Sequence, residues 1–141
     1  MDDAIILSEA IRMVNEGIAV TFPVNGRSML PFIVGGRDSV VLVKNRQLKV
    51  GEIVLAKTDR GQVIHRVVAL DGEHVTLMGD GNLVGREYCE VSQVEAFVSH
   101  VVRGNRKTIS VDGVGWKFFS KIWFLMLPFR RYLLAFYRRL F

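Results

Sequence analysis

Ser28 and His65 are the two residues whose side chains could carry out covalent chemistry together. Ser28 lies in the stretch Gly26-Arg27-Ser28-Met29, which begins at an Asn-Gly turn and leads to Pro31. A serine hydroxyl is a poor nucleophile unless a base takes its proton, so the partner has to come from elsewhere in the chain. A histidine suits that role, because neutral imidazole is abundant near pH 7. Together the two residues would support acyl transfer.

A β-strand is expected to hold His65 in place. In "QVIHRVVAL" (62–70), period-two geometry puts Val63, His65 and Val67 on one face and Ile64, Arg66 and Val68 on the other. β-Branched neighbours would fix the ring and remove part of its water. His100 lies in another predicted strand and is a second candidate base, whereas His74 follows Gly72-Glu73 and should be exposed.

The first 112 residues otherwise read as short strands. Runs rich in valine and isoleucine alternate with glycine, aspartate and asparagine at residues 18–24, 38–45, 51–58, 62–70, 74–79 and 94–104, with one more strand over 106–111. Residues 4–16 carry apolar side chains at helical spacing, and Gly17 is a plausible stop. We therefore expect a mainly β fold, a compact coiled antiparallel sheet or partial barrel with an N-terminal helix.

Four short motifs occur in a fixed order between residues 26 and 82. They are "GRSMLP" (26–31), "VGEIVLAK" (50–57), "IHRVVAL" (64–70) and "LMGDGN" (77–82). This order resembles the superfamily of type I signal peptidases and LexA-type self-cleaving proteins, with its Gly-x-Ser-Met-x-Pro nucleophile, Val-Gly-Asp-Ile-Val strand, base-bearing strand and Gly-Asp-Asn turn. The His-Arg-Val context of His65 is similar to the endoplasmic-reticulum and archaeal signal peptidases, which use histidine where the others use lysine. The resemblance implies the signal peptidase/LexA fold and a serine endopeptidase.

The same resemblance assigns roles to matching positions. Ser28 would form the acyl-enzyme, and its backbone N–H would donate to the oxyanion. Gly26, Arg27 and Met29 complete the nucleophile turn; leader peptidases carry a hydroxyl at the position of Gly26, so here a backbone N–H has to replace it. Lys57 is a weaker alternative base, because it lies on the strand before the base strand.

Two acids compete for the third place in the site. In the histidine type, an aspartate a few residues beyond the Gly-Asp turn orients the imidazole, but this chain reads "GNLVGREYC" there. Asp80 matches the turn motif, and Glu87 matches the approximate spacing. Both therefore stand as candidate catalytic residues.

The composition changes near residue 112. Residues 1–112 carry a net charge of −1, whereas residues 113–141 carry six basic residues, no acidic residue and ten aromatic residues. A basic stripe beside large apolar side chains is typical of a helix lying in a membrane interface, and Pro128 should kink or split it. We divide the chain into a peptidase-like domain (1–112) and an amphipathic helical tail (113–141), with predicted membrane contacts at Trp116, Lys117, Lys121, Trp123, Arg131, Arg138 and Arg139.

Other features of the sequence narrow the function classes. Cys89 is the single cysteine, so a disulfide framework and a cysteine metal cluster are excluded, and no metal or cofactor is expected. The acidic start "MDD" and the early break at Ser8-Glu9 do not fit a secretory signal, and no stretch offers a spanning apolar run. A nucleic-acid role is disfavoured, because the basic stripe is embedded in apolar side chains. We expect a peripheral membrane protein on the cytoplasmic side.

Three functions are compatible with this reading. The first is a signal-peptidase-like serine endopeptidase that uses Ser28 and His65 to cleave leader sequences from exported proteins or peptides, which would bind as an added strand at an exposed sheet edge. The second is a LexA-like self-cleaving regulator, although no Ala-Gly cleavage pair occurs in the chain and no helix-turn-helix domain precedes the motif. The third is a membrane-associated binding module with weak catalysis. For the tail, packing on the domain or on a partner subunit is the alternative to membrane docking.

Overall fold

The computed structural model describes residues 3–25, 29–81, 85–104 and 107–126, and in the C-terminal segment residues 132, 134–136 and 139. The described elements, in chain order, are helix α1 (Asp3–Asn15), strands β1 (Val20–Pro23), β2 (Asp38–Val43), β3 (Ile53–Thr58), β4 (Gly61–Asp71), β5 (His74–Met78) and β6 (Glu87–Glu90), the 3-10 turn η1 (Val91–Gln93), strands β7 (Val94–Arg103) and β8 (Lys107–Ser110), and helix α2 (Val114–Leu125). The predicted N-terminal helix and the predicted strands are all confirmed.

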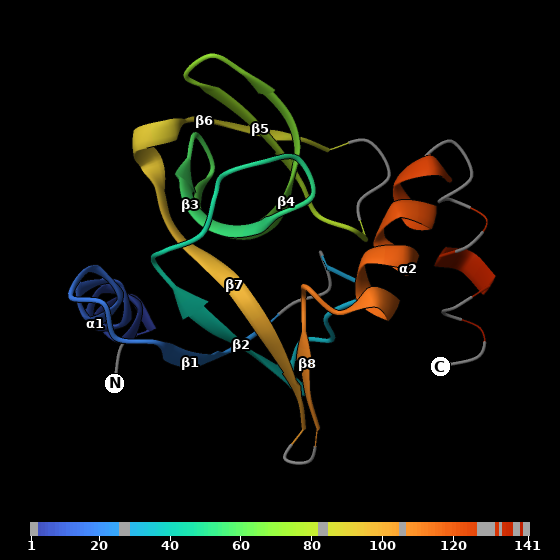
Figure 1. The fold of residues 1–141 in the computed structure, drawn as a ribbon, viewed down its shortest axis with the longest axis horizontal. Coiled ribbons are helices and arrows are strands. Elements are labelled where there is room, and N and C mark those ends of the chain that lie inside the picture. Colours follow the sequence, from blue (N-terminus) through green and yellow to red (C-terminus); the bar gives the residue numbers. More distant parts are fainter. Residues whose placement is uncertain are drawn as a thin grey trace.

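The strands form one antiparallel sheet that curls on itself. Its order is β1-β2-β7-β3-β4-β5-β6, and β8 pairs with the end of β7. Register shifts in the β2–β7, β3–β7 and β4–β5 pairs help the strands bend, as bulges do. In Figure 1 the β3–β6 part closes into a half-barrel, with α1 at the left of the view and α2 at the right. The predicted fold class, mainly β with a coiled antiparallel sheet, is confirmed.

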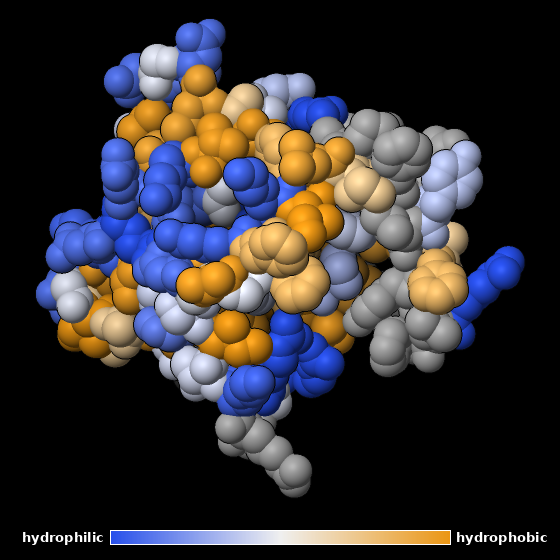
Figure 2. All heavy atoms as spheres, turned by 45° about the vertical axis from the view of Figure 1, so that its right-hand side comes forward, coloured by the Kyte–Doolittle hydropathy of each residue, from blue (hydrophilic) through white to orange (hydrophobic). Residues whose placement is uncertain are grey.

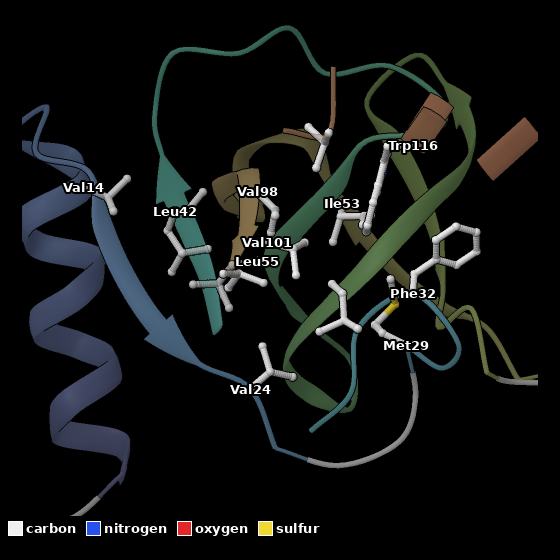
Figure 3. Packing of buried hydrophobic residues seen from close by; sticks show 14 residues of the cluster. Val14, Val24, Met29, Phe32, Leu42, Ile53, Leu55, Val98, Val101 and Trp116 are labelled. Atoms are coloured by element: carbon white, nitrogen blue, oxygen red, sulfur yellow. The ribbon is translucent and has the colours of Figure 1, made fainter. Parts of the chain in front are cut away.

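Two hydrophobic clusters fill the two sides of this curl. The larger cluster gathers side chains of α1, β2, β3, β7, the loop that follows residue 28, and α2. Figure 3 shows Met29 and Phe32 of that loop lying together at one end of the cluster. The smaller cluster lies inside the half-barrel and consists of Val54, Ala56, Val67, Val75, Leu77 and Cys89. The Ile53–Thr58 strand separates them, because its alternate side chains point to opposite faces.

Strand β6 is the element that the sequence did not predict. Its four residues, Glu-Tyr-Cys-Glu, are mostly polar, yet they alternate buried and exposed along β5. Tyr88 is exposed while Glu87 and Cys89 are buried. A buried glutamate gives the wrong pattern for a strand read from hydrophobicity alone, and this residue becomes important at the site.

Helix α2 packs on the sheet domain. Trp116, near its first turn, is only 8 % exposed and belongs to the larger cluster. Trp123, two turns later, packs against the same cluster. None of the helices in the described part of the chain is long and apolar enough to cross a membrane. The predicted kink at Pro128 lies outside the described residues.

Candidate active site

A pocket of about 280 Å³ lies between the end of β1, the loop after residue 28 and the start of β4. Most of its lining is apolar: Leu7, Phe22, Pro23, Val24, Met29, Leu55, Val63 and Ile64, together with Asn25, Gln62 and His65. Ser28, with Gly26 and Arg27, lies outside the described residues. The residues on either side of that turn, Asn25 and Met29, both line the pocket that His65 lines. The fold therefore brings the predicted base to the two ends of the predicted nucleophile turn.

His65 is held by a buried hydrogen-bond partner, Glu87. Its Nδ1 contacts the Glu87 carboxylate, and the two side chains are 8 % and 6 % exposed. An ionised carboxylate only accepts hydrogen bonds, so this contact favours the tautomer with the proton on Nδ1. Nε2 then carries the lone pair, which is the arrangement of an oriented general base.

The strand register explains why Glu87 reaches His65. Val67 on β4 lies opposite Leu77 on β5, and Leu77 lies opposite Glu87 on β6. Residues directly opposite one another share a face of the sheet, and His65 shares the face of Val67 because it is two residues away. Glu87 is thus placed on the inner face of the half-barrel, beside the imidazole.

Asp80, the other candidate acid, has a different partner. Both of its carboxylate oxygens accept hydrogen bonds from Arg66, at 2.8 Å from Nε and 2.7 Å from Nη2. Arg66 and Asp80 are 3 % and 1 % exposed. Arg66 neighbours His65 in β4 and so faces the opposite side of the strand. Between the two candidates, Glu87 contacts the imidazole, and Asp80 pairs with the arginine beside it.

Sequence reasoning did not identify Arg66 as a site residue, although it placed this side chain on the face opposite His65. The missed signal was chemical. An arginine buried in a strand requires an acidic partner, because an unpaired buried charge is costly. Asp80 in the Gly-Asp turn is the acid that pairs with this arginine, and Arg66 Nη1 also donates to the Gly51 carbonyl at 3.0 Å.

The alternative bases lie elsewhere. Lys57 is exposed, and it lies opposite Gln62 near the end of β3, whereas His65 lies opposite Val54. The ring of His100 contacts the Ser99 hydroxyl at 2.8 Å on β7. His74 is exposed, as predicted, and its Nδ1 lies 3.2 Å from Glu90. None of these three lines the pocket between residues 25 and 29, whereas His65 does.

Two predicted membrane contacts point toward the protein. Trp116 and Trp123 both pack edge-on against Phe32, with ring centroids 5.3 Å and 6.1 Å away. This differs from the predicted interface orientation, because the two indoles are the largest apolar groups on the helix and the sheet domain offers them Phe32. Lys117 and Lys121 are exposed, as is Arg139, while Arg131 and Arg138 lie outside the described residues.

Among the described residues, no group of three histidine, cysteine, aspartate or glutamate side chains is arranged as metal ligands. Cys89 is buried, as predicted, on the β6 face that points into the smaller cluster. Burial, together with the nearby charge of Glu90, raises the pKa of its thiol, which favours the unreactive protonated form.

Comparison of the sequence with models of known protein families finds one match. The sequence model of the family described as Peptidase S24-like matches residues 3–100, which include α1, the nucleophile motif, the base strand and Glu87. A search of curated proteins returns no match to this chain.

Proposed function

Because this chain belongs to the Peptidase S24-like family of serine peptidases, we propose that it is a serine endopeptidase of the histidine-base type that removes leader sequences from exported polypeptides at a membrane. The observation that carries this proposal is the buried His65–Glu87 pair, because its histidine lines one pocket together with Asn25 and Met29, the residues on either side of the Ser28 turn. Ser28 attacks the scissile carbonyl while His65 takes its proton. Glu87 orients the imidazole and stabilises the imidazolium that forms.

Acyl transfer then proceeds in two halves. The proton on His65 passes to the leaving amine, and the acyl-enzyme remains on Ser28. Water enters, His65 accepts its proton, and the second tetrahedral intermediate releases the leader as its carboxylic acid while His65 returns the proton to the Ser28 oxygen. The apolar pocket wall formed by Phe22, Leu55 and Ile64 suits small apolar side chains of a substrate that runs along the edge strand β1.

Processing of a reporter that carries a leader tests the mechanism. Ser28→Ala and His65→Ala should each abolish cleavage and leave the far-UV circular dichroism spectrum unchanged. Lys57→Ala is the matched control, because Lys57 is exposed on a neighbouring strand, and it should cleave normally. Retained cleavage in either site variant would remove that residue from the mechanism.

The outward face of α2 supports the membrane part of the proposal. Phe118, Ile122 and Leu125 are 58 %, 40 % and 69 % exposed, and they lie on the side of the helix away from Trp116 and Trp123. Lys117 and Lys121 are exposed beside them. Figure 2 shows apolar side chains gathered with charged ones on the side that carries α2. A helix with this pattern lies in the interface of an anionic bilayer, on the cytoplasmic side.

Vesicle sedimentation tests this surface. Phe118→Ser combined with Leu125→Ser should release the protein from vesicles that contain phosphatidylserine, because each side chain contributes about 1.5–3 kcal/mol when fully buried. Ile18→Ser is the control, since Ile18 is 45 % exposed but lies after α1. Equal sedimentation of the double variant and the control would show that α2 does not bind the membrane.

A self-cleaving regulator is the second candidate, favoured by the family match itself, since the superfamily includes LexA-type proteins. Its substrate would be a peptide bond of this chain. Purified protein kept at alkaline pH would then give two fragments in a mass spectrum, and Ser28→Ala would stay intact. An unchanged wild-type mass leaves the endopeptidase acting on other chains.

A further inference from the structure

Helix α2 holds the loop that follows the predicted nucleophile. Phe32, 9 % exposed, lies between the two tryptophans of the helix and packs edge-on against both of them. In Figure 3 Trp116 and Phe32 lie on the same side of the cluster, with Met29 next to Phe32. The loop from Met29 to Ile33 is closed by hydrogen bonds from the amides of Phe32 and Ile33 to the Met29 carbonyl, both 3.0 Å long.

Asp80 connects the same helix to Met29 through its backbone. Its amide N–H donates to the Met29 sulfur at 3.4 Å, and its carbonyl accepts a hydrogen bond from Trp123 Nε1 at 3.0 Å. One residue of the Gly-Asp turn thus contacts the residue after Ser28 on one side and α2 on the other. Because Asp80 is 1 % exposed, water competes little for these contacts.

Arg66 also holds Asp80 and Phe32 in place. Its side chain anchors Asp80 through two hydrogen bonds, and its guanidinium lies 5.1 Å from the centre of the Phe32 ring. Met29 is 2 % exposed and also lines the candidate active-site pocket. The contacts therefore run without a break from α2, through Asp80 and Phe32, to the pocket wall that adjoins Ser28 in sequence.

We infer that Trp123 is a positioning residue: its indole N–H fixes Asp80, and Asp80 with Phe32 fixes the loop that sets the orientation of the nucleophile turn. The helix that presents Phe118 and Leu125 outward is thus also a clamp on the catalytic loop. Because Ser28 is a nucleophile only under the function proposed above, this role depends on that function. A small displacement of a reacting group lowers the rate sharply, so the clamp acts on turnover and leaves substrate affinity nearly unchanged.

Trp123→Phe tests the inference, because it keeps an aromatic ring against Phe32 and removes the indole N–H. Three readouts are taken on the whole chain, and one of them is kcat and KM for cleavage of a leader peptide. Hydrogen–deuterium exchange follows the amides of Phe32 and Ile33, and a fluorophosphonate probe measures the rate of Ser28 acylation. The variant should exchange these amides faster and react about tenfold more slowly, with kcat lowered and KM little changed. The control is Val101→Ala, a core truncation on β7 whose backbone pairs with β2 and β8.

Each outcome separates the clamp from the proposed activity. Unchanged exchange at Phe32 and Ile33 in Trp123→Phe overturns the inference whatever the protein catalyses. Faster exchange with an unchanged probe rate also overturns it, since the loop would then not position Ser28. An equal fall in probe rate in Val101→Ala would show general destabilisation instead of positioning. If wild-type protein neither reacts with the probe nor cleaves a leader, the proposed function fails, and the exchange result alone decides whether α2 holds the loop.

Discussion

Glu87→Gln is the most direct test of whether the carboxylate of Glu87 assists His65 as a general base. The amide keeps the size of the side chain and can still accept from Nδ1, but it cannot stabilise the positive charge that the imidazole gains when it takes the proton of Ser28. Both side chains are almost fully buried, at 8 % and 6 % exposed, so solvent supplies little replacement for the lost charge.

The size of the effect follows from this burial. A hydrogen bond to a charged group contributes about 1.5–3 kcal/mol. If that contribution arises when the imidazolium forms, its loss raises the barrier by the same amount, and each 1.36 kcal/mol changes the rate tenfold. Glu87→Gln should therefore lower kcat by about ten- to 150-fold and change KM little.

Single-turnover cleavage of a leader peptide measures this step separately from product release. The chain offers a matched control in His74 and Glu90, a second histidine–glutamate pair that is 75 % and 49 % exposed. Glu90→Gln should cleave at the wild-type rate. A kcat for Glu87→Gln within twofold of wild type, or an equal loss in Glu90→Gln, would refute the role of the buried carboxylate.

Three further predictions concern the groups around the site. Asp80→Asn should destabilise the fold by about 3–5 kcal/mol in urea, because it leaves the buried Arg66 charge without its partner; a loss below about 1 kcal/mol would mean that the pair is not needed. Cys89 should react slowly with a disulfide reagent in folded protein and rapidly in urea, since burial raises its thiol pKa; fast labelling without urea would contradict its placement on β6. The hydrogen bond from Arg46 lowers the pKa of Asp112 to about 2 from an ordinary 3.8, so its contribution to stability is present above pH 4 and is lost as the pH falls through 2. Because the Asp112 side chain is 54 % exposed, the effect should be small. In a plot of the urea-unfolding midpoint against pH, Asp112→Asn should reduce the fall at acid pH and change no other part of the curve. An unchanged fall would show that the Arg46–Asp112 pair contributes nothing to stability.

The sequence by itself determined the strands other than β6, the N-terminal helix and the face on which each side chain of β4 lies. These follow from local geometry, because side chains alternate along a strand whatever its partners are. Thus His65 and Arg66 could be assigned to opposite faces in advance, and both are found there with different acidic partners. Strand β6 escaped prediction, since its buried glutamate breaks the apolar alternation on which a strand is recognised.

Only the tertiary structure decided which acidic side chain pairs with His65 and which pairs with Arg66. The choice depends on the register of β4, β5 and β6, which is set by packing between strands far apart in sequence. That register places Glu87 opposite Leu77, on the face of His65, and Met78 opposite Arg66, with Asp80 two residues further along the chain. The tail was decided in the same way: its helical pattern is local, but the inward turn of Trp116 and Trp123 depends on Phe32, a residue more than eighty positions earlier that the fold places beneath them.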